Sequence, residues 1–171
     1  MDVFLSKIRP KGEEMFKVLF VCLGNICRSP SAEAVMKAYV ERAGLSESIF
    51  CDSAGTAGYH VGERADARMR KHGAKRGYDL TSRSRQVAFP DDYETFDMII
   101  AMDASNMRDL QDLDEDGQYE DKLHMMTSFC QRESTDHVPD PYYGGADGFE
   151  RVLDLLEDAC EGLLQHIQIR R

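Results

Sequence analysis

The sequence is short of basic residues. Its 171 residues include 21 lysines and arginines against 31 aspartates and glutamates, which gives a net charge of −10 at pH 7. Nucleic-acid-binding proteins neutralise phosphates with clustered lysine and arginine, so this balance argues against a nucleic-acid partner. It does not argue against phosphate as such. A phosphate site can be built locally from backbone N–H groups, a helix terminus and one arginine, and charges beyond about 8 Å are largely screened at physiological salt.

Cysteine and long apolar runs are also scarce. Five cysteines, an odd number, do not form the disulfide framework of a small secreted protein. No Cys-x2-Cys pair occurs and the histidines lack ligand spacing, so we expect no metal and no other cofactor. The sequence contains no run of about 18 apolar residues that could span a membrane. The first fourteen residues lack the apolar stretch of a secretory signal. The composition therefore predicts a soluble, cytoplasmic, globular protein.

The length predicts one domain, because chains divide into two only beyond roughly 250 residues. We expect residues 1–16 to be a poorly ordered N-terminal extension and residues 17–171 to form the single domain. Met15 stands close before the first organised element. Two interpretations stay open: Met15 is the natural start, or the residues before it are a genuine frayed tail. A monomer is the default expectation.

Short apolar runs alternate with helical periodicities along the chain. We expect strands at 18–21, 49–53, 96–102 and, more weakly, 122–129. We expect helices at 32–43, 64–72, about 104–113 and about 149–167. This alternation predicts an α/β fold, a doubly wound (flavodoxin-like) four-stranded parallel sheet with helices on both faces. Ligands of such sheets bind beyond the carboxyl ends of the strands.

The segment C-L-G-N-I-C-R-S-P, residues 22–30, follows the first expected strand. Gly24 and Asn25 tolerate positive φ and can curl the backbone into an anion-binding nest of N–H groups. Ser29 and Pro30 are suited to open a helix as N-cap and first residue, and the helix N-terminus favours anions. A cysteine in such a nest is favoured as the thiolate. The alternative is a buried structural cysteine before an ordinary capped helix.

Residues 18–33 closely resemble the low-molecular-weight protein tyrosine phosphatases, whose phosphate loop reads V-C-x-G-N-x-C-R-S-P. The Y-H-x-G segment at 59–62 and the compact length resemble the bacterial members of that family. The resemblance extends over nearly the whole chain from residue 16. It implies metal-independent hydrolysis of phosphotyrosine through a phosphocysteine, with Cys22 as nucleophile, Arg28 holding the phosphoryl oxygens and Ser29 donating to the thiolate. It implies that Cys27 can form a reversible, protective disulfide with the nucleophile. The other residues implied for the loop are Leu23, Gly24, Asn25 and Ile26.

A leaving phenoxide needs a proton, and a general acid typically contributes about 10²–10⁴-fold. The segment V-P-D-P-Y-Y-G-G at 138–145 is by itself an ordinary turn. Beside the Cys22 loop it resembles the acid loop of the family, which implies Asp140 as general acid and then base. The two tyrosines of this segment either pack the start of a helix or stack on an aromatic leaving group. The pocket walls implied by the resemblance are Ile26, Tyr59, Tyr142 and Tyr143.

The resemblance also implies a polar network that holds the phosphate loop in shape. Its implied members are Asn25, Ser29, Ser53 and His72, with His72 linked to Ser53. By residue type and position alone, His72 would instead be a solvated surface histidine. Two roles stay open for Asp103: it orients Arg28, or it caps a helix.

Two further residues near these segments receive no catalytic role. We interpret His60 as a surface residue and Asp66 as a turn residue.

Three other functions share parts of this pattern. Arsenate reductases of the same fold need closely spaced redox cysteines and lack the Asp-Pro acid. Protein arginine phosphatases carry a threonine in place of Ile26. A silent phospho-binding module would not need Cys22, Arg28 and Asp140 together. Phosphotyrosine in a protein is therefore the favoured substrate, and family association suggests a bacterial tyrosine kinase as the partner.

Overall fold

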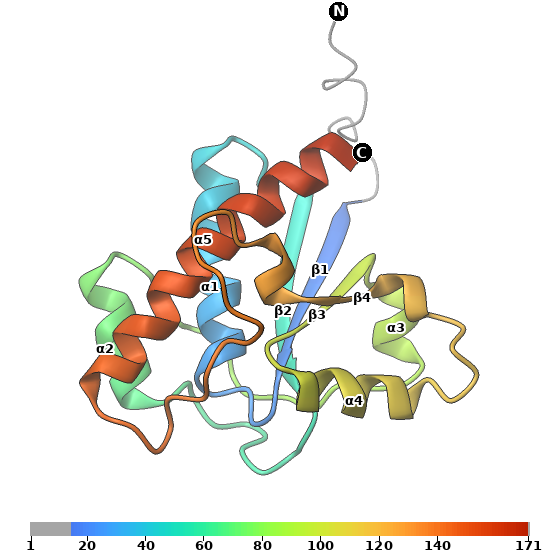
Figure 1. The fold of residues 1–171 in the computed structure, drawn as a ribbon, viewed down its shortest axis with the longest axis horizontal. Coiled ribbons are helices and arrows are strands. Elements are labelled where there is room, and N and C mark those ends of the chain that lie inside the picture. Colours follow the sequence, from blue (N-terminus) through green and yellow to red (C-terminus); the bar gives the residue numbers. More distant parts are fainter. Residues whose placement is uncertain (1–14, 171) are drawn as a thin grey trace, which may run out of the picture.

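The computed structural model describes residues 15–170. Its sheet contains β1 (Phe16–Cys22), β2 (Ile49–Gly55), β3 (Met98–Ala101) and β4 (Leu123–Met125), all parallel, in the order β2-β1-β3-β4 (Figure 1). The predicted doubly wound, four-stranded parallel sheet is thereby confirmed. Within the described residues no helix is long and apolar enough to cross a bilayer.

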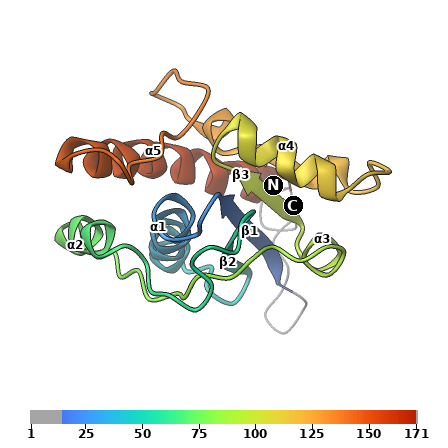
Figure 2. The same ribbon diagram turned by 90° about the horizontal axis from the view of Figure 1, so that it is seen from below.

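Helices cover both faces of the sheet. Figure 2 shows α1 and α5 on one side and α3 and α4 on the other. The side chains of β1 alternate between two cores: Val18 and Phe20 pack on the α1/α5 side, and Leu19 and Val21 on the α3/α4 side. A strand buried on both faces reads as a continuous apolar run, which is how β1 could be recognised in the sequence. The helices are α1 (Arg28–Arg42), α2 (Ala67–Lys75), α3 (Asp91–Thr95), α4 (Ala104–Leu113) and α5 (Ala146–Arg170), with 3₁₀ turns η2 (Glu120–Lys122) and η3 (Met126–Phe129).

The ends of several elements differ from the prediction. Phe16, assigned above to the N-terminal extension, is the first residue of β1, and its N–H donates to Ser48 O at 2.9 Å. Of that extension, residues 1–14 lie outside the described residues. The expected strand at 122–129 is only three residues long and then turns into η3. Gly162 of α5 leaves no room for a Cβ against Phe129 O, so η3 packs directly on α5 rather than extending the sheet.

Helix α1 begins earlier than expected. It starts at Arg28 with Cys27 in the N-cap position, and no side chain caps it. The prediction that Ser29 is the N-cap is therefore wrong, because the Ser29 hydroxyl points to other partners inside the fold. The predicted end is confirmed: Gly44 follows the helix with φ 72°.

The topology determines where a ligand could bind. Because the strands are parallel, the ends of β1, β2 and β3 meet at one edge, at Cys22, Gly55 and Ala101. Val138 joins the same edge, since its N–H donates to Met102 O at 2.8 Å. Segments far apart in the sequence thus meet around the Cys22 loop.

Candidate active site

The loop between β1 and α1 is curled by a single left-handed residue. Asn25 has φ 56°, which confirms that this position adopts positive φ, whereas Gly24 does not. The Asn25 side chain stabilises the turn through three hydrogen bonds. Its Nδ2 donates to Ser29 Oγ at 2.8 Å and to Ser53 Oγ at 3.0 Å, and its Oδ1 accepts from the N–H of Arg85 at 3.0 Å. Asparagine is one of the few residues that reach this conformation at low cost.

The loop after β2 lies directly against the curled loop. The N–H of Thr56 donates to Cys22 O at 2.9 Å, and that of Ala57 to Leu23 O at 3.0 Å. Gly55 permits this approach, because a Cβ there would lie 2.7 Å from Leu23 O. The two loops therefore support each other, and Leu23 and Gly24 are held at the mouth of the site.

Cys22 ends β1 with 3% of its surface exposed. Its Sγ lies 3.0 Å from Ser29 Oγ. Since Asn25 Nδ2 donates to the Ser29 oxygen, the Ser29 proton is free to point to sulfur, and the alternative acceptor, Ala54 O, is farther away at 3.4 Å. Ser29 can therefore donate to the sulfur, and Cys22 lies next to the N-terminal end of α1.

Arg28 is almost fully buried, with 3% of its surface exposed, and its guanidinium has three oxygen partners. Its Nη1 donates to Asp103 Oδ2 at 2.6 Å and to Val138 O at 3.1 Å, and its Nη2 lies 3.6 Å from Asp140 Oδ2. These contacts set the plane of the guanidinium at the edge of the sheet. A planar fork held in this way can grip two oxygens of a phosphate.

Asp103 performs both of the roles left open above. One carboxylate oxygen accepts from Arg28, and the other accepts from the N–H of Asn106 at 2.8 Å, which caps α4. Partial burial acts to raise the pKa of Asp103, but the hydrogen bonds from Arg28 and from backbone N–H groups outweigh it and lower that pKa.

Asp140 lies on the segment that follows Val138, with its side chain 40% exposed. Its Oδ1 accepts from the N–H of Tyr142 at 3.0 Å, so the carboxylate turns back over its own loop while Oδ2 faces Arg28. The structure thus brings together Cys22, Arg28 and Asp140, although Asp140 is 118 residues from Cys22 in the sequence.

Arg68 holds this acid segment against α2. Asp66 caps α2 and accepts from Arg68 Nη2 at 2.9 Å, and the same Nη2 donates to Tyr142 O at 3.0 Å. The Arg68 guanidinium also lies over the Tyr142 ring, 5.4 Å from its centroid. Asp66, to which we assigned no chemistry, therefore contributes through structure: it orients the arginine that fixes the Tyr142 backbone next to Asp140.

A pocket of about 530 Å³, open on one side, lies above Cys22. All four expected wall residues line it: Ile26 is buried, Tyr142 is partly exposed, and Tyr59 and Tyr143 stand at the rim, 76% and 93% exposed. His60, interpreted above as a surface residue, is a wall as well. Its ring lies 6.3 Å from the Tyr142 ring, and its Nδ1 pairs with Glu63 at 2.7 Å. Its position directly after Tyr59 was the signal that it could share the pocket.

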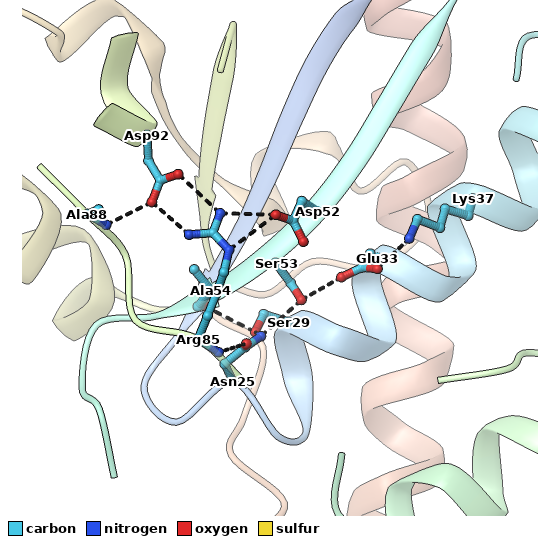
Figure 3. A network of polar contacts seen from close by, with 10 residues as sticks. All are labelled: Asn25, Ser29, Glu33, Lys37, Asp52, Ser53, Ala54, Arg85, Ala88 and Asp92. Atoms are coloured by element: carbon cyan, nitrogen blue, oxygen red, sulfur yellow. Dashed lines mark hydrogen bonds and ion pairs between the residues drawn. The ribbon is translucent and has the colours of Figure 1, made fainter. Parts of the chain in front are cut away.

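The prediction for His72 is wrong. Its Nδ1 lies 2.7 Å from Glu150 Oε2, and its ring stacks on Phe149 at 5.3 Å, so it joins α2 to α5. Glu33 occupies the place expected for it. Ser53 Oγ donates to Glu33 Oε1 at 2.6 Å, and Lys37 Nζ donates to Glu33 Oε2 at 2.5 Å (Figure 3). Ser29, Glu33 and Lys37 follow one another at i, i+4 spacing on one face of a helix, a signal present in the sequence.

Arg85 is a second residue that the sequence analysis missed. Its backbone N–H holds Asn25, and its guanidinium donates to Asp52 and to both oxygens of Asp92 at 2.9–3.2 Å (Figure 3). The Asp92 carboxylate in turn accepts from the N–H of Ala88 at 2.7 Å. The loop between β1 and α1 is thereby tied to the segment before α3, and no local pattern around Arg85 indicates this.

Cys27 lies beside Cys22 and also lines the pocket, and both are free thiols. Burial, with the nearby Asp66 carboxylate, raises the pKa of Cys27 well above the usual thiol range. Cys27 is therefore a neutral thiol at physiological pH.

Comparisons with known proteins agree with this geometry. Residues 17–171 match the family described as "Low molecular weight phosphotyrosine protein phosphatase". A low molecular weight protein-tyrosine-phosphatase of Streptomyces coelicolor is 43% identical over 90% of this chain and 94% of its own. The crystal structure of a protein tyrosine phosphatase from Entamoeba histolytica, with Hepes in its active site, has a TM-score of 0.88 at 52% identity and covers 91% of this chain and 98% of that one. A Drosophila arginine phosphatase has a TM-score of 0.80 at 32% identity, covering 88% and 97%.

Proposed function

Since the chain belongs to the low molecular weight phosphotyrosine protein phosphatase family, we propose that it hydrolyses phosphotyrosine in proteins through a phosphocysteine intermediate and without a metal. The observation that carries the mechanism is the meeting of a thiol, a buried arginine and an aspartate in one pocket. Cys22 lies at its base, and Arg28 Nη2 is 3.6 Å from Asp140 Oδ2.

The first chemical step transfers the phosphoryl group to the enzyme. The Cys22 thiolate attacks phosphorus, a sulfur–phosphorus bond forms, and the bond from phosphorus to the phenolic oxygen breaks. Protonated Asp140 gives its proton to that oxygen, so tyrosine leaves as a neutral phenol. Arg28 and the N–H groups at the start of α1 hold the other phosphoryl oxygens, where charge is greatest.

The second step releases phosphate. A water molecule attacks the phosphocysteine and gives a proton to the Asp140 carboxylate, while the sulfur–phosphorus bond breaks and the thiolate returns. Ser29 supports both steps in the same way, because its hydroxyl, 3.0 Å from Cys22 Sγ, donates to the thiolate as attacking and as leaving group. The enzyme ends in its starting protonation state.

An assay with p-nitrophenyl phosphate in a chelating buffer tests the proposal. The wild-type protein should turn over and accumulate an acid-stable phosphoenzyme, whereas Cys22→Ser should do neither. Cys130→Ser is the matched control, because Cys130 lies outside the pocket and should be dispensable. Activity retained by Cys22→Ser would refute the mechanism.

The role of Asp140 has its own test. Asp140→Ala should lose turnover mainly with leaving groups of high pKa, such as phenol or an alkyl alcohol, and much less with p-nitrophenol. An equal loss with every leaving group would remove Asp140 from the role of general acid.

The wall at Ile26 favours a phenyl ring over a guanidinium. Ile26 is 8% exposed and lines the pocket with apolar atoms, and the tyrosine rings complete an aromatic opening. Because one structural relative is an arginine phosphatase, phosphoarginine is the second candidate substrate. Ile26→Thr should shift the ratio of phosphoarginine to phosphotyrosine hydrolysis toward phosphoarginine. No shift would contradict the role of this wall.

The proposal extends to partners and regulation. The enzyme acts as a cytoplasmic monomer, and its substrate is a phosphotyrosine protein such as a bacterial tyrosine kinase. A pull-down with Cys22→Ser or Asp140→Ala from the source cell identifies that substrate. After a peroxide converts Cys22 to a sulfenic acid, the neutral thiol of Cys27 displaces water from it to form a disulfide.

A further inference from the structure

A second groove adjoins the phosphate pocket and shares two of its walls. Leu23 and Tyr59 line both spaces, and Thr56 and Ala57 continue the groove from the loop after β2. Its other wall is α4, which runs along the carboxyl-end edge of the sheet (Figure 1). The groove measures about 690 Å³ including its open mouth. When a phosphotyrosine enters the pocket, residues next to it in the peptide can extend across this shared rim.

The α4 wall combines apolar and anionic groups. Asp109, Asp112 and Leu113 have i, i+3 and i+4 spacing and line the groove together, whereas Leu110 is buried in the core. Leu113 and Leu23 are each 40% exposed. In the part of the chain that the structure describes, neither aspartate forms an ion pair with a lysine, arginine or histidine.

Two features of this groove fit a side chain that has both an apolar stem and a positive charge. Exposed leucine side chains on both of its walls form an apolar floor that water solvates poorly. In addition, the carboxylates of Asp109 and Asp112 give the same groove negative charge.

We propose that this groove is a subsite for a lysine or arginine side chain that flanks the phosphotyrosine of the substrate protein. The long aliphatic stem packs on Leu23 and Leu113 while the charged head reaches Asp109 and Asp112. A glutamate in the same place would be repelled. The inference rests on the proposed phosphotyrosine activity and adds the substrate class to it: a phosphotyrosine segment with basic neighbours.

The test compares kcat/KM for seven-residue peptides with a central phosphotyrosine. In each peptide, two positions on one side of the phosphotyrosine are both arginine, both glutamine or both glutamate, and alanine fills the rest. The three peptides are made once with the variable pair on the N-terminal side and once with it on the C-terminal side. We expect wild type to prefer the arginine peptide over the glutamine peptide by about 3–10-fold on one side, as for two partly exposed ion pairs, and the glutamate peptide to be the slowest. The preference should shrink as salt is raised.

The variant Asp109→Asn with Asp112→Asn should abolish that preference and leave hydrolysis of p-nitrophenyl phosphate unchanged. The matched control is Asp116→Asn with Asp121→Asn, which removes the same charge from exposed positions outside the groove. The inference is overturned if wild type shows no preference for the arginine peptide, or if the control variant loses it equally. If wild type does not hydrolyse p-nitrophenyl phosphate at all, the proposed function is refuted instead, so the two failures are distinguishable.

Discussion

Replacing Asp103 separates two contributions that one carboxylate makes. Asp103→Asn keeps a good helix N-cap, because asparagine caps as well as aspartate does, but it removes the charge that faces Arg28. Asp103→Ala removes both. The side chains of Arg28 and Asp103 are 3% and 25% exposed. The cost of breaking this ion pair should therefore lie between that of a buried pair, about 3–5 kcal/mol, and that of a surface pair, at most about 1 kcal/mol.

We therefore expect Asp103→Asn to lower the free energy of unfolding by about 2 kcal/mol. Asp103→Ala should lower it by about 1 kcal/mol more through the lost cap of α4. Urea unfolding at pH 7 measures both values. Asp116→Asn, at an exposed position, is the control for the loss of one negative charge.

Activity should fall together with stability in both variants. Without the 2.6 Å hydrogen bond to Asp103, Arg28 keeps Val138 O and the nearby Asp140 carboxylate, so its plane turns away from the phosphate. A misplaced catalytic group can cost up to about 10²-fold, and we expect kcat/KM for p-nitrophenyl phosphate to fall about tenfold. Full activity and an unchanged urea midpoint in Asp103→Asn would refute this account of Arg28.

The same pair makes a pH-dependent prediction. The pKa of Asp103 lies below its ordinary value of 3.8 in the folded protein. Its contribution is therefore fully present above that ordinary value and is lost as the pH falls through the folded value. The stability gap between wild type and Asp103→Asn should be full at pH 7 and close in acid. A gap that stays constant down to the acid limit of folding would contradict the assigned ion pair.

Substitutions at two positions test other contacts of the site, and a labelling experiment tests the buried thiol of Cys51. Arg68→Ala should leave the urea midpoint near that of wild type. It should lower kcat about tenfold for substrates with poor leaving groups, because the backbone beside Asp140 is no longer held. An equal loss of kcat with p-nitrophenyl phosphate would contradict this role. Asn25→Ala should destabilise by about 2–4 kcal/mol, since hydrogen bonds are lost and a left-handed φ is imposed on alanine, and Asn25→Gly should recover about 1 kcal/mol of that in urea unfolding. Burial raises the pKa of Cys51 to about 12, so iodoacetamide at pH 8 should label Cys51 only after unfolding, as read by peptide mass spectrometry. Cys22, which lines the open pocket, should be labelled in the native protein.

The elements that could be predicted are those whose signal is local. The continuous apolar run of β1 and the apolar stripe of α5 each follow from burial on given faces. The parallel sheet with helices on both faces follows from the alternation of strands and helices, whereas the strand order came from the structure. The short α3 (Asp91–Thr95) and the turn of η3 had no such signal. Their conformation depends on what packs against them, as the contact of η3 with Gly162 shows.

The residues that support the Cys22 loop also divide into those with a local sequence signal and those without one. Glu33 could have been identified, because its i, i+4 relation to Ser29 on one helix face is visible in the sequence. The contact between Arg85 and Asn25 could not, since 60 residues separate them and neither residue type requires the other. His72 was assigned by resemblance rather than by a physical signal, and the packing of α2 on α5 turned it to Glu150 instead.

The sequence by itself determined the chemistry available at the site. A thiol, an arginine and a glycine–asparagine pair stand within seven consecutive positions, 22–28, and must lie near one another because neighbours in the chain cannot be far apart. Only the tertiary structure decided what surrounds that loop. Parallel strands bring their carboxyl ends to one edge of the sheet. This arrangement placed Asp103 and Asp140 next to the two terminal nitrogens of Arg28. It also made His60 a wall of the pocket and brought the acidic side of α4 beside that pocket.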